Sequence, residues 1–209
     1  MSKETTKLKL KNKMIAVIRE PNFQLAKKIC ETLVENGIEC LEITFSIPNA
    51  EELIADLSKT LPLAFIGAGT VLNKEQAKKA IDAGANFIMS PCIVEEVGSY
   101  CKEKDILCSM GAMTPSEAYQ SYLLGSDIVK LFPGEMLAPR MIKAIHAPMP
   151  FIDIMPTGGV DHKNVKEWLD LGAYACGFGG YFSKDINFEN LDLLKIRIKQ
   201  LLEAVGENK

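Results

Sequence analysis

Lys130 lies in the middle of the apolar segment 127–132, which has the composition of a short buried strand. Side chains alternate along a strand, so Ile128, Lys130 and Phe132 share one face. If that face is interior, removal from water disfavours the charged amine, and the neutral amine becomes a usable nucleophile. The alternative is a lysine that reaches solvent or pairs with a carboxylate for structural reasons.

Glu42 interrupts a second apolar segment, 40–45, in the same way and with the opposite charge. Leu41 and Ile43 face one side of this predicted strand, whereas Glu42 and Thr44 face the other. A buried amine beside a carboxylate that can move protons is what imine chemistry on a carbonyl substrate requires. A structural ion pair between the two strands explains the same pattern.

A glycine-rich stretch, Gly67-Ala68-Gly69-Thr70, ends the third apolar segment. It is not a dinucleotide-binding fingerprint, because Leu72 stands where the third glycine of that motif belongs. The stretch indicates either a close approach of a ligand to the backbone, with the Thr70 hydroxyl available to an anion, or a tight turn without a ligand.

Two glycine pairs follow the last two apolar segments: Gly158 and Gly159 come after Thr157, and Gly179 and Gly180 close the eighth segment. In barrels of parallel strands, the loops at these two places often form a phosphate cup. Arg19 follows the first segment and is either a cation for the same rim or an exposed surface arginine.

The elements that must position these residues alternate regularly. Apolar segments predicted as strands begin at Met14, Cys40, Leu63, Phe87, Ile106, Asp127, Phe151 and Ala173. Amphipathic segments with three- and four-residue spacing separate them, and a final helix is predicted over 191–205. Eight βα units without an insertion predict one closed (β/α)8 TIM barrel over residues 1–209, with a short N-terminal helical extension. An open doubly wound sheet is the second possibility.

Helix ends carry their own signals. Capping-box spacing is present at Thr114–Glu117, Asn49–Glu52 and Asn73–Gln76. Four glycines stand where a helix should end before the next strand, and glycine adopts the required left-handed conformation easily. They are Gly37, Gly84, Gly125 and Gly172.

Composition points to a small-molecule partner. The chain is 47% hydrophobic and 24% charged, with a formal net charge of -3, and its scattered basic residues predict no binding of nucleic acid or membrane. The polar N-terminus predicts a cytoplasmic protein. The six cysteines include no CxxC pair, and with only two histidines we expect free thiols and no metal or cofactor.

Between about Met14 and Gly180, the assembled motifs resemble the family of 2-keto-3-deoxy-6-phosphogluconate (KDPG) and 4-hydroxy-2-oxoglutarate (KHG) aldolases. These are class I, Schiff-base enzymes with a (β/α)8 fold, commonly homotrimers. The matching pieces are Leu41-Glu42-Ile43-Thr44, Gly67-Ala68-Gly69-Thr70-Val71, Ser90-Pro91, Lys130-Leu131-Phe132-Pro133 and Pro156-Thr157-Gly158-Gly159.

The resemblance implies a role for each candidate residue. Lys130 would form the imine with the keto carbon, and Glu42 would be the general acid and base. The implied substrate contacts are Thr70 to the pyruvate carboxylate, Pro91 and Phe132 along the pocket, Thr157 to the substrate hydroxyl, and the amides of Gly158 and Gly159, with Gly179 and Gly180, to a phosphate.

Two features of this chain depart from the family pattern. Several members have a carboxylate-binding arginine after the second strand, where 45–48 has none. Others keep an arginine after the first strand, which Arg19 matches. The family also usually has a serine in the last phosphate loop, where this chain has Gly180 followed by Tyr181.

The predicted function is therefore reversible cleavage of a 2-keto-4-hydroxy acid, which we expect to be phosphorylated. The first candidate substrate is KDPG, whose products would be pyruvate and glyceraldehyde 3-phosphate. KHG and 2-keto-3-deoxy-6-phosphogalactonate are alternative substrates. A phosphate-binding barrel isomerase and a non-enzymatic receiver-type domain are alternatives from other classes. An isomerase has no need of the Lys130 amine, and a receiver domain has an acidic cluster where this chain has Val17-Ile18-Arg19.

Overall fold

All eight apolar segments form strands in the computed structural model, which describes residues 2–206. The strands are β1 (Met14–Ile18), β2 (Cys40–Thr44), β3 (Phe65–Gly69), β4 (Phe87–Met89), β5 (Leu107–Ser109), β6 (Gly111–Ala112), β7 (Val129–Leu131), β8 (Ile154–Pro156) and β9 (Cys176–Phe178). The fifth predicted strand is divided into β5 and β6.

A helix follows most strands, as the amphipathic segments predict. The helices are α1 (Lys3–Leu10), α2 (Phe23–Glu35), α3 (Ala50–Thr60), α4 (Lys74–Asp82), α5 (Glu95–Glu103), α6 (Pro115–Leu123), α7 (Met141–His146), α8 (Val165–Asp170), α9 (Gly180–Ser183) and α10 (Leu191–Val205), with a 3₁₀ turn at Gly134–Met136. The N-terminal helical extension is confirmed as α1, whereas α9 was not predicted.

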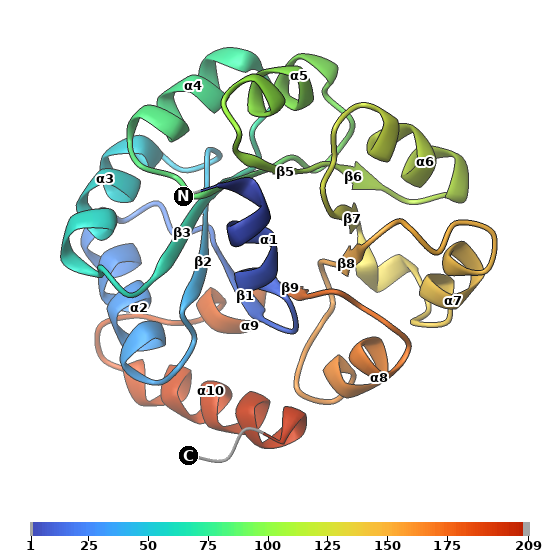
Figure 1. The fold of residues 1–209 in the computed structure, drawn as a ribbon. Coiled ribbons are helices and arrows are strands. Elements are labelled where there is room, and N and C mark those ends of the chain that lie inside the picture. Colours follow the sequence, from blue (N-terminus) through green and yellow to red (C-terminus); the bar gives the residue numbers. More distant parts are fainter. Residues whose placement is uncertain (1, 207–209) are drawn as a thin grey trace.

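The strands are parallel and form two curled sheets, where the (β/α)8 prediction expected one closed sheet. One sheet has the order β5-β4-β3-β2-β1-β9 and the other the order β6-β7-β8. Consecutive strands are neighbours, without the reversal of order that defines a doubly wound sheet. Figure 1 shows the outer helices arranged in a ring around the strands, with α1 lying across the middle of the ring.

The division between β5 and β6 occurs at Met110, because side chains bond to its backbone. The Met110 N–H donates to Ser126 Oγ at 2.9 Å, and Ser121 Oγ donates to the Met110 carbonyl at 3.0 Å. At the other junction, between β8 and β9, Thr157 and Gly177 form an isolated parallel bridge.

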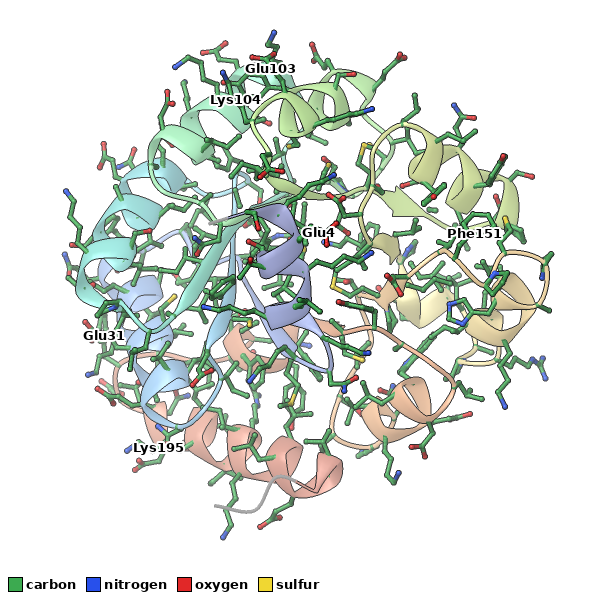
Figure 2. The ribbon with its side chains drawn as sticks, viewed as in Figure 1. Glu4, Glu31, Glu103, Lys104, Phe151 and Lys195 are labelled. Carbon is green, nitrogen blue, oxygen red and sulfur yellow. The ribbon has the colours of Figure 1, made fainter. Side chains whose placement is uncertain are left out.

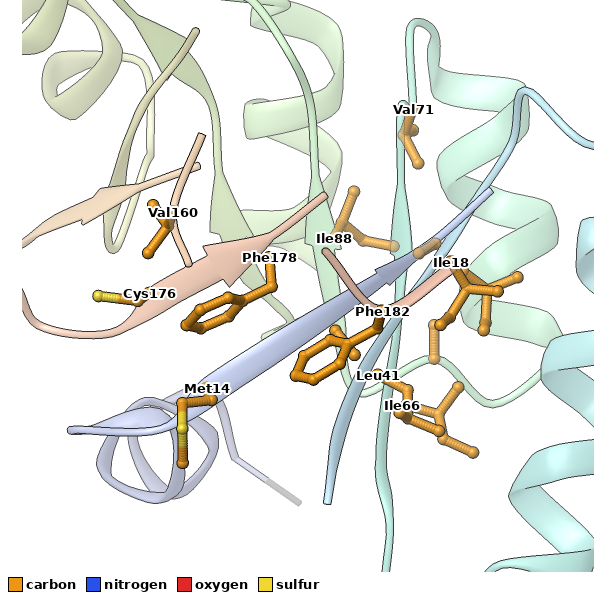
Figure 3. Packing of buried hydrophobic residues seen from close by; sticks show 14 of the residues in the cluster. Met14, Ile18, Leu41, Ile66, Val71, Ile88, Val160, Cys176, Phe178 and Phe182 are labelled. Carbon is orange, nitrogen blue, oxygen red and sulfur yellow. The ribbon is translucent and has the colours of Figure 1, made fainter. Parts of the chain in front are cut away.

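Each strand has an inner and an outer face, and the two faces belong to separate apolar clusters. Outward residues such as Leu41, Ile66 and Phe178 pack under the helices in the larger cluster (Figure 3). The inner cluster consists of Leu10, Ile15, Cys40, Phe65, Phe87, Met89, Leu107, Ile128, Met155 and Ala175. Ile128 lies inside while Val129 and Leu131 lie outside, which confirms the alternation predicted around Lys130.

Helix α1 covers the amino ends of the strands. Its last residue, Leu10, is fully buried in the inner cluster. Two ion pairs hold the helix to segments just before β7 and β8: Lys3 pairs with Asp127 at 2.9 Å and Lys7 with Asp153 at 2.7 Å. The inner space is therefore filled and covered at this end.

The outer surface of the helical ring is charged. Figure 2 shows Glu31, Lys104 and Lys195 at the periphery, pointing away from the strands. Among residues 2–206, no helix combines the length and apolar character needed to span a membrane.

The helix-end predictions are mostly correct. Thr114 and Glu117 form a full capping box, and Asn73 accepts from the Gln76 N–H at 2.8 Å. The prediction at Asn49 is wrong: its φ is 57°, and in this left-handed conformation its side chain makes no cap bond. All four predicted helix-ending glycines have a left-handed φ between 99° and 105°.

All six cysteines are free thiols, as predicted, and only Cys92 is exposed. Burial raises the pKa of both Cys40 and Cys176 to about 12. A hydrogen bond with Cys101, together with burial, raises the pKa of Cys108. These buried thiols stay protonated at neutral pH, so they are poor nucleophiles.

We expect Leu10→Ala to lower the free energy of unfolding by about 2 to 5 kcal/mol, because it removes fully buried apolar atoms and leaves a cavity. Urea denaturation measures the change. Leu8→Ala is the control on the same helix; Leu8 is 71% exposed, and its loss should change stability by no more than about 0.5 kcal/mol. Equal losses for the two variants would contradict the role given to α1.

We expect a thiol reagent such as dithiobisnitrobenzoate to label one thiol per native chain at neutral pH and all six after denaturation. Cys92→Ser should abolish the native labelling. Rapid native labelling that survives this substitution would show that a buried thiol is accessible.

Candidate active site

The centre of the site is a buried ion pair between β7 and β2. Lys130 Nζ lies 3.1 Å from Glu42 Oε1 and 3.4 Å from Oε2. Lys130 is 4% exposed and Glu42 is 1% exposed. The two residues come from segments 88 positions apart, and the structure confirms that their side chains face the same inner space.

Glycines on β3 make room for this pair. Gly69 pairs with Thr44 in the β2–β3 register, next to the Glu42 carboxylate. A Cβ on Gly69 would overlap that carboxylate, and a Cβ on Gly67 would overlap the Phe87 ring. The glycine run therefore has a packing reason: it gives inner space to Glu42 and to the Phe87 ring beneath the site.

A cavity of about 400 Å³ opens above the ion pair at the carboxyl ends of the strands. This volume lies in the range of small-molecule sites. The lining consists of Val17, Arg19, Thr70, Pro91, Lys130, Phe132, Glu135, Thr157, Gly158, Gly159, Gly179, Gly180 and Ser183. Every residue predicted to contact substrate is in this set, and Glu42 reaches the site through its bond to Lys130.

Two threonines in the lining have unusual environments. Thr70 has a φ of 55°, which is a strained conformation for a β-branched residue, and such strain concentrates at functional sites. Thr157 is 3% exposed, and within the described residues its Oγ1 has no hydrogen-bond partner. An unpaired buried hydroxyl is costly, so Thr157 suits contact with a ligand, and the strained backbone of Thr70 marks it as a second candidate.

Four glycines form another part of the cavity lining. Gly158 and Gly159 have φ values of 91° and 68°, and a Cβ on either would overlap Glu135. Gly179 and Gly180 lie beside them in the lining. Arg19 is exposed but also lines the cavity, so its side chain is available to an anion there.

Three lining residues were not predicted: Val17, Glu135 and Ser183. Val17 was detectable, since it shares an inner strand face with Arg19 by alternation. Glu135 follows the Pro133-Gly134 turn, where no periodic pattern fixes its direction. Ser183 lies on α9, a four-residue helix too short to show a sequence periodicity.

An outer cavity of about 630 Å³ adjoins the first across a shared wall of Glu135, Gly159, Gly179 and Gly180. Tyr181 lines this outer cavity, and its hydroxyl lies 3.1 Å from His162 Nδ1. Burial, and to a smaller extent Asp161, raises the pKa of Tyr181 to about 12. The tyrosine therefore stays neutral at physiological pH.

The chain is an α/β protein with parallel strands and a buried lysine–carboxylate pair under a cavity at the strand ends. The model of one family, the KDPG and KHG aldolases, matches residues 5–199. The chain belongs to this family, and the match extends the resemblance seen between Met14 and Gly180.

Curated relatives agree with the family. The chain is 30% identical over 197 residues to 2-dehydro-3-deoxy-phosphogluconate aldolase of Haemophilus influenzae, covering 92% of each chain. It is also 30% identical over 168 residues to 2-dehydro-3-deoxy-6-phosphogalactonate aldolase of Escherichia coli K12, covering 79% of this chain and 82% of the relative.

A solved relative shows the same fold with a ligand. The structure of KDPG aldolase from Legionella pneumophila superposes with a TM-score of 0.82 at 27% identity, covering 96% of each chain. It holds pyruvate captured at low pH as a covalent carbinolamine intermediate.

We expect Lys130→Met to lower the free energy of unfolding by about 3 to 5 kcal/mol, because it leaves the Glu42 carboxylate buried without its partner. The double variant Lys130→Met/Glu42→Leu should recover most of this loss, since neither charge remains. Lys166→Met, which breaks an exposed pair with Asp170, is the control and should cost at most about 1 kcal/mol. Urea denaturation of the variants measures all three values; a double variant as unstable as the single one would contradict this account of the pair.

Proposed function

We propose that the protein is a class I aldolase that reversibly cleaves a 2-keto-4-hydroxy acid through a Schiff base on Lys130. The buried contact between Lys130 and Glu42 beneath the cavity is the observation that carries the proposal. Family membership and the covalent pyruvate adduct in the Legionella enzyme support the same chemistry.

Covalent chemistry begins at Lys130. After transferring a proton to Glu42, which lies within hydrogen-bond distance, the neutral amine attacks the C2 carbonyl carbon. Glu42 returns its proton to the hydroxyl of the resulting carbinolamine, which leaves as water, so that a protonated imine and the Glu42 carboxylate remain. As the C3–C4 bond breaks, its electron pair moves toward the imine nitrogen and forms an enamine.

Glu42 carries the protons of the later steps. Directly or through a water molecule, it takes the C4 hydroxyl proton as the aldehyde forms, and a proton is then returned to C3 of the enamine. Water hydrolyses the imine, which releases pyruvate and restores the Lys130 amine. The imine nitrogen accepts the electrons, so the mechanism proposes no metal or cofactor step.

The remaining lining residues take their proposed places along the substrate. Thr70 binds the pyruvate carboxylate, and Pro91 and Phe132 form the apolar wall beside C2 and C3. Thr157 meets the C4 hydroxyl, for which its unpaired Oγ1 is suited. Arg19 pairs with a carboxylate or phosphate of the substrate, and the amides of Gly158, Gly159, Gly179 and Gly180 bind the distal group.

KDPG is the proposed substrate, with pyruvate and glyceraldehyde 3-phosphate as products, which would place the enzyme in the Entner–Doudoroff pathway. The alternatives are 2-keto-3-deoxy-6-phosphogalactonate, on which the Escherichia coli relative is named to act, and KHG, which the family description includes. A phosphate-binding isomerase is less well supported, because such an enzyme would not need the Lys130 amine as a nucleophile or Glu42 beside it.

We propose further that residues 1–209 form one (β/α)8 domain whose two sheets complete a single barrel. The Thr157–Gly177 bridge and the backbone bond from the Tyr174 N–H to the Ile154 carbonyl, at 2.8 Å, support closure between β8 and β9. We also propose a homotrimer, by resemblance to the family, and a cytoplasmic location. The six free thiols suit a reducing compartment.

Incubation with pyruvate and borohydride tests the covalent step. We expect the intact mass to rise by one reduced pyruvate per chain, and peptide mapping to place the adduct on Lys130. Lys130→Met should remain unmodified, whereas the control Lys163→Met, at an exposed site, should react like the wild type. An adduct that persists in Lys130→Met, or no adduct in the wild type, would refute the mechanism.

A further inference from the structure

Glu135 is a charged residue of the cavity lining for which the proposed mechanism has no task. The lining also contains Arg19 and Lys130, and both have proposed roles. Within residues 2–206, the Glu135 carboxylate forms no ion pair and accepts no hydrogen bond. Its two oxygens are therefore available to accept hydrogen bonds from a ligand in the cavity.

Backbone contacts hold Glu135 against the loop that follows β8. The Gly134 N–H donates to the Thr157 carbonyl at 2.7 Å. A Cβ on Gly134 would lie 2.5 Å from the Gly158 carbonyl oxygen, so the 3₁₀ turn packs against this loop without space for a side chain between them. The backbone of Glu135 is therefore fixed relative to Thr157 and Gly158.

The carboxylate of Glu135 lies at the Thr157 end of that loop. A Cβ on Gly158 would overlap Glu135 Oε2, whereas a Cβ on Gly159 would overlap the Cβ of Glu135. The charged group is thus beside Gly158, the residue that follows Thr157. Because Thr157 meets the C4 hydroxyl in the proposed mechanism, the Glu135 carboxylate lies beside the next carbon of the substrate, C5.

The candidate substrates differ at C5. In 2-keto-3-deoxygluconate and in its 6-phosphate, KDPG, C5 carries a hydroxyl that can donate a hydrogen bond. In KHG, C5 is itself a carboxylate. An ionised carboxylate such as that of Glu135 accepts hydrogen bonds but donates none, and it repels a second carboxylate. The phosphate of KDPG lies beyond C6, farther from Thr157, so this contact concerns the hydroxyl and not the phosphate.

We propose that Glu135 is a specificity-determining residue that accepts a hydrogen bond from the C5 hydroxyl of sugar-derived 2-keto-3-deoxy acids and repels the C5 carboxylate of KHG. This inference rests on the proposed aldolase function, because Lys130 must fix C2 for C5 to reach Glu135. It narrows the substrate class: the aldehyde product carries a hydroxyl, and not an anionic group, on the carbon next to its carbonyl.

Glu135→Gln tests the proposal, because it keeps the size of the side chain and an acceptor oxygen but removes the charge. We expect kcat/KM for KHG to rise roughly 3- to 10-fold as the repulsion is lost. For 2-keto-3-deoxygluconate, kcat/KM should fall roughly 2- to 5-fold, since a neutral oxygen is a weaker acceptor than a carboxylate. Neither substrate carries a phosphate. Pyruvate release, followed by chromatography, measures both values.

Glu4→Gln is the matched control. It makes the same change in net charge at an exposed site on α1, which covers the opposite ends of the strands, and should alter neither value. Added sodium chloride supplies a second readout. The gain in KHG cleavage on Glu135→Gln should shrink as the salt concentration rises, because screening weakens the repulsion in the wild type.

Pyruvate separates a role at C5 from damage to the catalytic lysine. Pyruvate ends at C3 and does not reach Glu135, so the borohydride adduct on Lys130 should form in Glu135→Gln as fast as in the wild type. An unchanged ratio of the two kcat/KM values, a gain on KHG that salt does not reduce, or slower adduct formation in the variant would each overturn the assignment of Glu135. Absence of the adduct in the wild type would instead overturn the aldolase function.

Discussion

The buried contact between Lys130 and Glu42 constrains the strands that surround it. Two opposite charges that are each almost completely removed from water are tolerated only when each satisfies the other. The surrounding sequence provides that arrangement. Gly69 leaves space for the carboxylate, and the β2 and β7 alternation aims both side chains at one point. Replacing a buried ion pair by well-packed apolar residues is often neutral or stabilising, so chemistry explains this pair better than stability does.

Much of the fold could be predicted because the local signals agree with the global arrangement. Period-2 alternation placed the Lys130 and Glu42 side chains inside. The helix-ending glycines were predicted correctly because the backbone must be left-handed at those positions, a conformation that glycine adopts easily. The break at Met110 was hidden, because it depends on hydroxyls of Ser121 and Ser126 that approach only in the folded chain.

The candidate site could be predicted where its residues lie at the ends of strands, but not at Ser183 on α9. Lining residues at strand ends were found, since parallel strands bring their carboxyl ends together. Ser183 was missed because its direction depends on the burial of Phe182, a tertiary contact. Asn49 failed as a helix cap for a related reason: its backbone adopts a left-handed turn that residue type alone does not reveal.

Helix α1 has a kinetic consequence. It covers the amino ends of the strands, with Leu10 inserted in the inner cluster. Substrates and products therefore reach and leave Lys130 through the opening at the carboxyl ends. Under the proposed mechanism, the keto-acid half remains covalently attached at the bottom of this one-sided pocket while the aldehyde half lies toward the mouth. The aldehyde must depart first and pyruvate last. In the reverse direction pyruvate must bind first, so steady-state inhibition patterns should be those of a compulsory-order reaction.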